Sequence, residues 1–205
     1  MGFFAELQKQ RWDDHRYYHH SRINQSLHLL SALSFLGMYA MVWVNPVVAA
    51  FLGWIVAMLL RQSGHFFFEP KGYDEVNQAT HEHKEDIKVG YNLHRKVVLL
   101  TIWALIPVVL FFDASLWGLM PAVPAGKSLY VYNLSILWLW LGAAAVLFRT
   151  LQLFFVADAK TGIVWLTKIL TDPLHDLKMY GKSPLHLARG ELIDPMKHVS
   201  EQVRA

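Results

Sequence analysis

The sequence predicts an all-α integral membrane protein, a helical bundle of about four transmembrane helices with cytoplasmic termini and C-terminal interfacial helices. Of the 205 residues, 54% are hydrophobic and only 17% are charged, whereas soluble domains carry about 25% charged residues. The apolar residues gather in four long runs, and nearly all basic residues lie on one side of these runs. The chain has no cysteine, which excludes disulfide scaffolds, iron–sulfur clusters and thiol nucleophiles.

The first two predicted spans form a hairpin. Crossing a bilayer takes about 20 mostly apolar residues, and residues 26–44 form such a run with His28 as its only ionisable side chain. The Asn-Pro pair at residues 45–46 predicts a tight turn, because proline has no N–H and restricts the residue before it. The second span is uncharged over residues 47–60, and we expect its helix to continue through residues 65–68 where that end is buried.

The third and fourth spans are predicted to form a second hairpin. Residues 97–112 are apolar but include Pro107, so a kink or a tilted placement is expected there. Residues 129–148 form an unbroken run rich in Trp and Leu. The first 156 residues are therefore expected to form the transmembrane domain, which also carries the metal site discussed below.

The C-terminal segment, residues 157–205, is different in kind. Residues 161–170 are amphipathic but short, and the chain beyond them is interrupted by prolines at positions 173, 184 and 195. This pattern predicts one or two helices that lie on the cytoplasmic face of the membrane.

The basic residues predict the orientation. Every Lys and Arg except Lys127 lies before the first span, between the second and third, or after the fourth. The positive-inside rule makes that side cytoplasmic, in either a bacterial inner membrane or an endoplasmic reticulum. Topology and attraction to anionic lipid explain the net charge of +3, so the membrane is a predicted partner and nucleic acid is not.

The histidines predict a metal site on the same side. His20, Asn24 and His28 share one helical face by their four-residue spacing, and His65 and Glu69 repeat this spacing at the end of the second span. The hairpin makes these ends neighbours. Neutral imidazole is the commonest metal ligand, and carboxylates complete sites for iron, manganese or zinc. The predicted ligands come from the histidines of this region: His19, His20, His28, His65, His81 and His83.

A less specific interpretation exists for each histidine, since imidazoles at membrane interfaces often only hydrogen-bond a neighbour. His15 and His19 form a four-residue pair on a charged segment, for which a solvated face is an alternative. The histidines at positions 175, 186 and 198 lie among prolines, and we expect no ligand role for them unless the C-terminal segment closes over the site as a lid.

Two motifs resemble a known family. YHHSRINQSLH at residues 18–28 and GHFFFE at residues 64–69 resemble the iron-dependent 2-hydroxy fatty acid dioxygenases, which are small polytopic membrane proteins. The resemblance implies Fe²⁺ as cofactor (one ion, with two as the alternative), O₂ as co-substrate and one-carbon shortening of 2-hydroxy fatty acids. It also implies catalytic roles for Asn24 and Glu69.

The remaining expectations concern the residues that bind the substrate and the functional class of the protein. Arg22 and Arg61 are candidates to pair with a substrate carboxylate, with anchoring to lipid phosphate as the alternative for each. Two other classes stay open: a di-iron lipid hydroxylase or desaturase, and a metal-binding transporter or scaffold without catalysis. The sequence leaves the oligomeric state open.

Overall fold

The computed structural model describes the chain except residues 1, 70–71, 75–76, 88–92, 121–122 and 196–205. The described part is helical and contains no strand. Its helices, in order, are α1 (Phe3–Tyr18), α2 (Arg22–Met41), α3 (Pro46–Ala50), the π-helix η1 (Phe51–Ala57), α4 (Met58–Phe68), α5 (His81–Ile87), α6 (Leu93–Phe112), α7 (Leu129–Val156), α8 (Ala159–Tyr180) and α9 (Ser183–Ala188).

Three helical stretches within the described residues are long and apolar enough to cross a membrane. They are Pro46–Phe68, which joins α3, η1 and α4, Arg95–Phe112 within α6, and Leu129–Val156, which is α7. These correspond to the second, third and fourth predicted spans. The first predicted span coincides largely with α2, but this helix is not among the three because its first two turns carry polar side chains. A fourth span at α2 stays a prediction.

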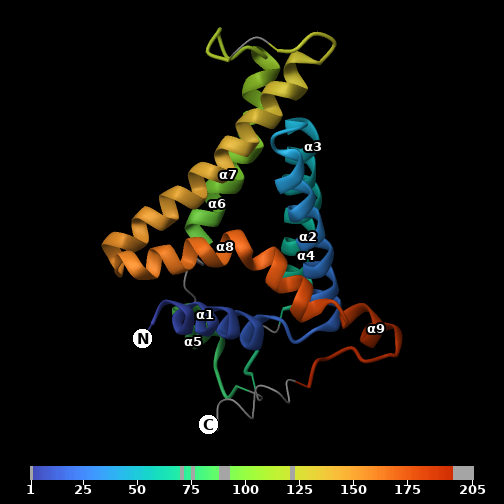
Figure 1. The fold of residues 1–205 in the computed structure, drawn as a ribbon, viewed down its shortest axis with the longest axis vertical. Helices are drawn as coiled ribbons and strands as arrows, with labels where there is room; N and C mark the ends of the chain where they lie inside the picture. Colours follow the sequence, from blue (N-terminus) through green and yellow to red (C-terminus); the bar gives the residue numbers. More distant parts are fainter. Residues whose placement is uncertain (1, 70–71, 75–76, 88–92, 121–122, 196–205) are drawn as a thin grey trace.

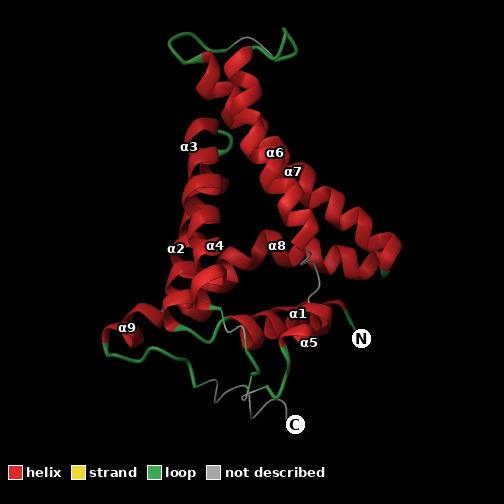
Figure 2. Ribbon diagram, turned by 180° about the vertical axis from the view of Figure 1, so that it is seen from behind, coloured by secondary structure: helices red, strands yellow, loops and turns green. Residues whose placement is uncertain are grey.

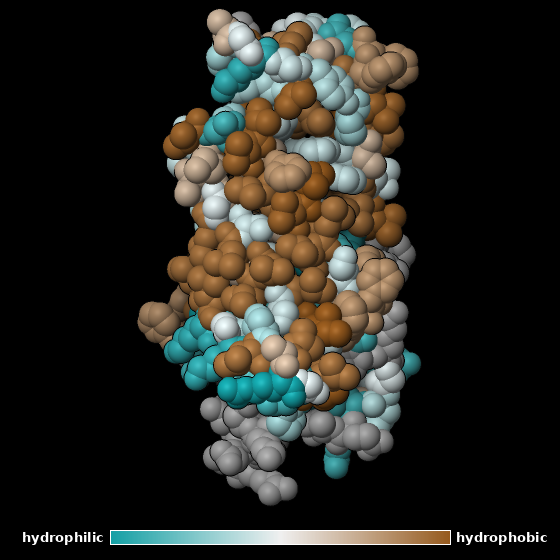
Figure 3. All heavy atoms as spheres, turned by 90° about the vertical axis from the view of Figure 1, so that its right-hand side faces the viewer, coloured by the Kyte–Doolittle hydropathy of each residue, from teal (hydrophilic) through white to brown (hydrophobic). Residues whose placement is uncertain are grey.

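The two hairpins meet near one end of the molecule and diverge toward the other (Figure 1). One hairpin consists of α2 and the α3–η1–α4 stretch, and the other consists of α6 and α7. At the wide end, α8 runs from the end of α7 across to the ends of α2 and α4, with α1 and α5 beyond it; the same arrangement is seen from behind in Figure 2. We call this end, formed by α1, α5, α8 and α9, the polar end. On the face shown in Figure 3, apolar side chains cover the middle of the molecule between its two ends.

The turn predicted at residues 45–46 is present. Pro46 occupies the first turn of α3, and the side chain of Asn45 caps that helix by accepting a hydrogen bond from the backbone N–H of Val48 at 3.4 Å. Tryptophans then join the two hairpins. The ring of Trp103 stacks between those of Trp54 and Trp138, and the indole N–H of Trp54 donates to the Trp138 carbonyl oxygen at 2.7 Å.

The C-terminal helix is longer than predicted. We expected a short helix ended by prolines, but α8 continues through Pro173 for 22 residues. Its buried residues, which include Val164 and Trp165, pack against α1, α2 and α7. This burial outweighs the backbone hydrogen bond that proline removes. As a result, the second half of α8 reaches the predicted metal site.

Candidate metal centre

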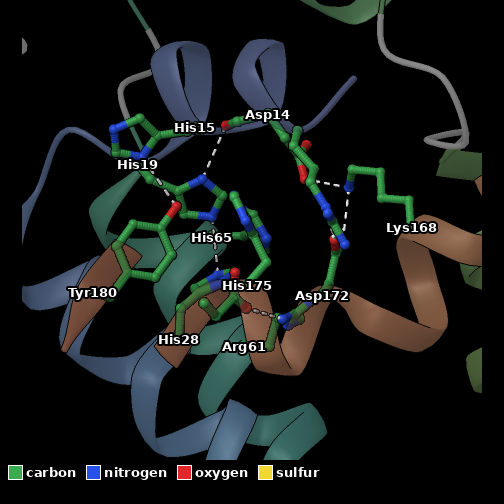
Figure 4. A pocket seen from close by; sticks show the side chains of 12 residues that line it. Asp14, His15, His19, His28, Arg61, His65, Lys168, Asp172, His175 and Tyr180 are labelled. Atoms are coloured by element: carbon green, nitrogen blue, oxygen red, sulfur yellow. Dashed lines mark hydrogen bonds and ion pairs between the residues drawn. The ribbon is translucent and has the colours of Figure 1, made fainter. Parts of the chain in front are cut away.

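Three of the predicted ligands converge at the polar end. His19 lies just after α1, His28 in the second turn of α2, and His65 near the end of α4. Each offers a ring nitrogen, and these nitrogens all lie within 4.8 Å of one another. The side chains point toward a common centre (Figure 4). Since they come from three segments, the site exists only when the hairpin and α1 are folded together.

Hydrogen bonds set the orientation of these imidazoles. Nδ1 of His19 lies 2.9 Å from the backbone oxygen of Asp14, and Nδ1 of His65 lies 2.6 Å from a carboxylate oxygen of Glu69. Both acceptors place the proton on Nδ1 and leave the lone pair on Nε2. A carbonyl or carboxylate on the far nitrogen is the usual partner of a metal-bound histidine.

His28 completes the arrangement. Its Nδ1 lies 4.0 Å from a carboxylate oxygen of Asp176, and its Nε2 lies 3.3 Å from Nε2 of His19. The lone pair of His19 Nε2 therefore accepts a hydrogen bond from the Nε2–H of His28, and a metal ion bound by both nitrogens would take the place of that proton. The donor set and its hydrogen bonds fit a metal ion.

Burial favours the ligating form of the imidazole. His19 is 3% exposed and His28 is 2% exposed. Burial lowers the pKa of His19 well below the ordinary value of a histidine, and the neighbouring His65 lowers it further. A metal binds neutral imidazole, so a lowered pKa removes competition from protons.

Gly64 and Asn24 allow helices α2 and α4 to approach each other at the site. A Cβ atom at Gly64 would lie 2.2 Å from Oδ1 of Asn24, so only glycine fits there. Asn24 is fully buried and donates from Nδ2 to the Tyr18 carbonyl oxygen at 2.9 Å, while Ser21 accepts from its backbone N–H. Asn24 thus fixes the end of α1 against α2 and α4, beside His28.

Helix α8 supplies the other wall of the pocket around the histidines. Its contributing residues recur every four positions and share one face: Lys168, Asp172, Asp176 and Tyr180. The hydroxyl of Tyr180 lies 3.1 Å from Nδ1 of His15, and its ring contacts that of His19. The sequence predicted no role for this face, and for His175, which also lines the pocket, it allowed one only if the C-terminal segment lay over the site. The four-residue recurrence was a signal that could have identified the face.

Charged groups of this wall are paired. Arg61 contacts Asp176 at 2.7 Å, and Nζ of Lys168 lies between Asp14 at 2.8 Å and Asp172 at 2.9 Å. Burial raises the pKa of Asp176, an effect that the guanidinium of Arg61 opposes. The pocket thus places the three candidate ligand histidines beside a paired cationic group, Arg61.

The other predicted site residues lie apart from this centre. His20 is within 3.5 Å of Asp74, and the exposed His81 and His83 lie on α5. Arg22 pairs with Asp194 at 2.9 Å, away from the pocket lining. Of the six predicted ligands, the structure brings together His19, His28 and His65.

The role of Glu69 can be tested by its neutral analogue. We expect Glu69→Gln to weaken metal binding by about 10- to 100-fold, because such partners of ligating histidines contribute that much to affinity. Competition titration with a chromogenic chelator measures the change. Glu191→Gln is the matched control, since a carboxylate oxygen of Glu191 lies 2.9 Å from Nδ1 of the half-buried His186, outside the pocket. Equal metal affinity in the two variants would contradict this role.

No family model, curated protein or solved structure matches the chain.

Proposed function

We propose that the protein is a membrane-embedded non-haem iron oxygenase that shortens 2-hydroxy fatty acids by one carbon with O₂. The observation that carries this proposal is the group His19, His28 and His65, whose ring nitrogens lie within 4.8 Å of one another beside Arg61. Three imidazoles leave part of a metal's coordination sphere open, as oxygen-activating and hydrolytic centres require.

The reaction balances without another reductant. A 2-hydroxy acid and one O₂ yield the acid shortened by one carbon, CO₂ and water. When bound, a ferrous ion would supply coordination positions for O₂ and for the carboxylate and hydroxyl of the substrate. The chain's own residues would hold that ion through His19, His28 and His65, with the backbone oxygen of Asp14 orienting the ring of His19 and Glu69 orienting that of His65.

Arg61 would position the substrate. Its guanidinium carries a donor set that matches a carboxylate, and it lies in the pocket beside the histidines, where it contacts Asp176. Tyr180, buried to 3% exposure, closes the opposite wall and limits the access of water.

The surroundings suit an amphiphilic substrate. Phe66 and Phe67, which directly follow His65, are 52% and 77% exposed. An acyl chain could therefore stay against the apolar surface of the hairpin while its head group enters the pocket. The positive-inside rule supports a cytoplasmic location for this end.

A single metal is favoured over two. Within the described ranges, one group of three or more potential ligands meets the distance requirement for a metal. This favours a mononuclear oxygenase over a di-iron hydroxylase or desaturase.

Oxygen uptake tests the proposal. Protein loaded anaerobically with Fe²⁺ is mixed with 2-hydroxypalmitate, and O₂ consumption and CO₂ release are recorded. We expect both with this substrate and neither with palmitate, which lacks the hydroxyl group. The variant His186→Ala, altered away from the pocket, should retain the activity, and His65→Ala should lose it. Uptake no greater than that of apoprotein would overturn the proposal, and hydrolysis by a zinc-loaded form would replace it.

The role of Arg61 gives a separate prediction. We expect Arg61→Gln to raise the KM for the 2-hydroxy acid by about 10- to 100-fold, because a hydrogen bond to a charged group contributes about 1.5–3 kcal/mol. Steady-state kinetics at several chain lengths measures this, with metal content determined in parallel. An unchanged KM in a metal-replete variant would remove Arg61 from substrate binding.

A further inference from the structure

A pair of arginines lies away from the pocket, where α6 and α7 approach the polar end. Nη1 of Arg149 donates to the side-chain oxygen of Gln152 at 2.9 Å, and Nη1 of Arg95 donates to the same oxygen. The two guanidinium groups therefore converge on one neutral acceptor. Neither residue lines the pocket of the histidines.

The positive charge of Arg149 is not balanced there. Its Nε is buried without a hydrogen-bond partner, and none of the ion pairs formed among the described residues includes Arg149. An amide oxygen supplies a dipole but no charge, so Gln152 does not neutralise the guanidinium of Arg149. Partly buried charge of this kind is stabilised by an anion at hydrogen-bond distance.

The surroundings of Arg149 indicate where the anion comes from. Large apolar side chains of the same helix are exposed around it: Leu147, Phe148, Leu151 and Phe155. In a membrane, lipid chains would cover these side chains. Arg149 lies about two turns before the end of α7 at Val156, from where a long side chain can reach the level of the headgroups.

We propose that Arg149, Arg95 and Gln152 form a binding site for the phosphate group of an anionic phospholipid. A guanidinium presents a planar pair of donors that matches two phosphate oxygens, and Gln152 holds the two groups at one point. The acyl chains of the same lipid lie along Phe148 and Leu151. The site is independent of the proposed catalytic function.

Lipid binding can be measured on the full-length protein after delipidation in a non-ionic detergent. Phosphatidylglycerol and phosphatidylcholine are titrated separately, and bound lipid is counted by native mass spectrometry. We expect about one phosphatidylglycerol per chain to bind more tightly than phosphatidylcholine. Arg149→Gln should weaken that binding by about tenfold or more, which is the contribution of a charge-assisted hydrogen bond. Arg149→Lys should be intermediate, since it keeps the charge but loses the planar pair of donors.

The control variants distinguish this site from general electrostatic attraction between basic residues and anionic lipid. Lys127→Gln removes a positive charge on the loop side of α7, where Lys127 lies over the ring of Tyr132, and should leave binding unchanged. Circular dichroism and the metal content of the histidine centre show whether Arg149→Gln is folded. Equal phosphatidylglycerol affinity in wild type and folded Arg149→Gln would overturn the proposal. Displacement of the lipid by millimolar inorganic phosphate would also overturn it, because the site would then recognise the free ion.

Discussion

Replacing His28 with alanine is expected to weaken metal binding by more than about 100-fold. His28 is one of three residues whose ring nitrogens lie within 4.8 Å, and its Nε2 is 3.3 Å from that of His19. Loss of a direct ligand should exceed the 10- to 100-fold that follows loss of an outer partner. Metal affinity is measured by chelator competition and metal content by mass spectrometry.

Two controls make this result specific. His186→Ala removes an imidazole that bonds to Glu191 outside the pocket and should bind metal like the wild type. His28→Gln keeps a polar side chain at this position, which is only 2% exposed. Comparing it with His28→Ala tests whether the loss of metal is caused by unfolding. Retention of metal by a folded His28→Ala variant would show that His28 is not a ligand.

Gly64→Ala is expected to produce the second large effect. The added Cβ would lie 2.2 Å from Oδ1 of Asn24 and 3.4 Å from Cδ2 of His28, so α2 and α4 would have to separate. Overpacking of this kind costs about 1–3 kcal/mol in the free energy of unfolding. It should also weaken metal binding, because the proposed ligands His28 and His65 lie on these two helices and ligand geometry tolerates only about 0.5 Å of displacement.

The matched control for this substitution is Gly142→Ala. Gly142 lies within α7, and a Cβ there would make an ordinary contact of 3.7 Å with the ring of Trp54. Thermal unfolding in detergent and chelator competition should separate the two variants: Gly142→Ala should behave like the wild type. If Gly64→Ala binds metal with unchanged affinity, close contact of α2 and α4 is not needed for the site.

Local patterns predicted much of the site because a short turn joins its two helices. The turn at residues 45–46 folds α2 back on the α3–η1–α4 stretch. This brings His28 to the same end of the molecule as His65 and Glu69, which lie four residues apart. The apolar runs likewise predicted four spans, and three of them correspond to helices long and apolar enough to cross a membrane. Such features depend on residues close in sequence, which a pattern can reveal.

Contacts between distant segments were not predictable in the same way. Pro173 indicated a helix end, yet burial against α1 and α2 continues α8 to Tyr180 and brings Asp176 to the metal centre. His20 follows His19 directly, but its ring lies near Asp74 in a loop more than fifty residues away. Neighbouring side chains at a helix junction point in different directions, and only the tertiary structure decides which one meets His28.

Iron K-edge X-ray absorption on anaerobically loaded protein tests the central claim most directly. The measurement gives the type and number of ligands, and the iron content per chain is determined on the same sample. The arrangement of His19, His28 and His65 predicts about one iron per chain with three imidazole ligands, and loss of iron from His65→Ala. Two irons per chain with a short iron–iron distance, or an iron that binds fewer than three imidazoles, would contradict the account.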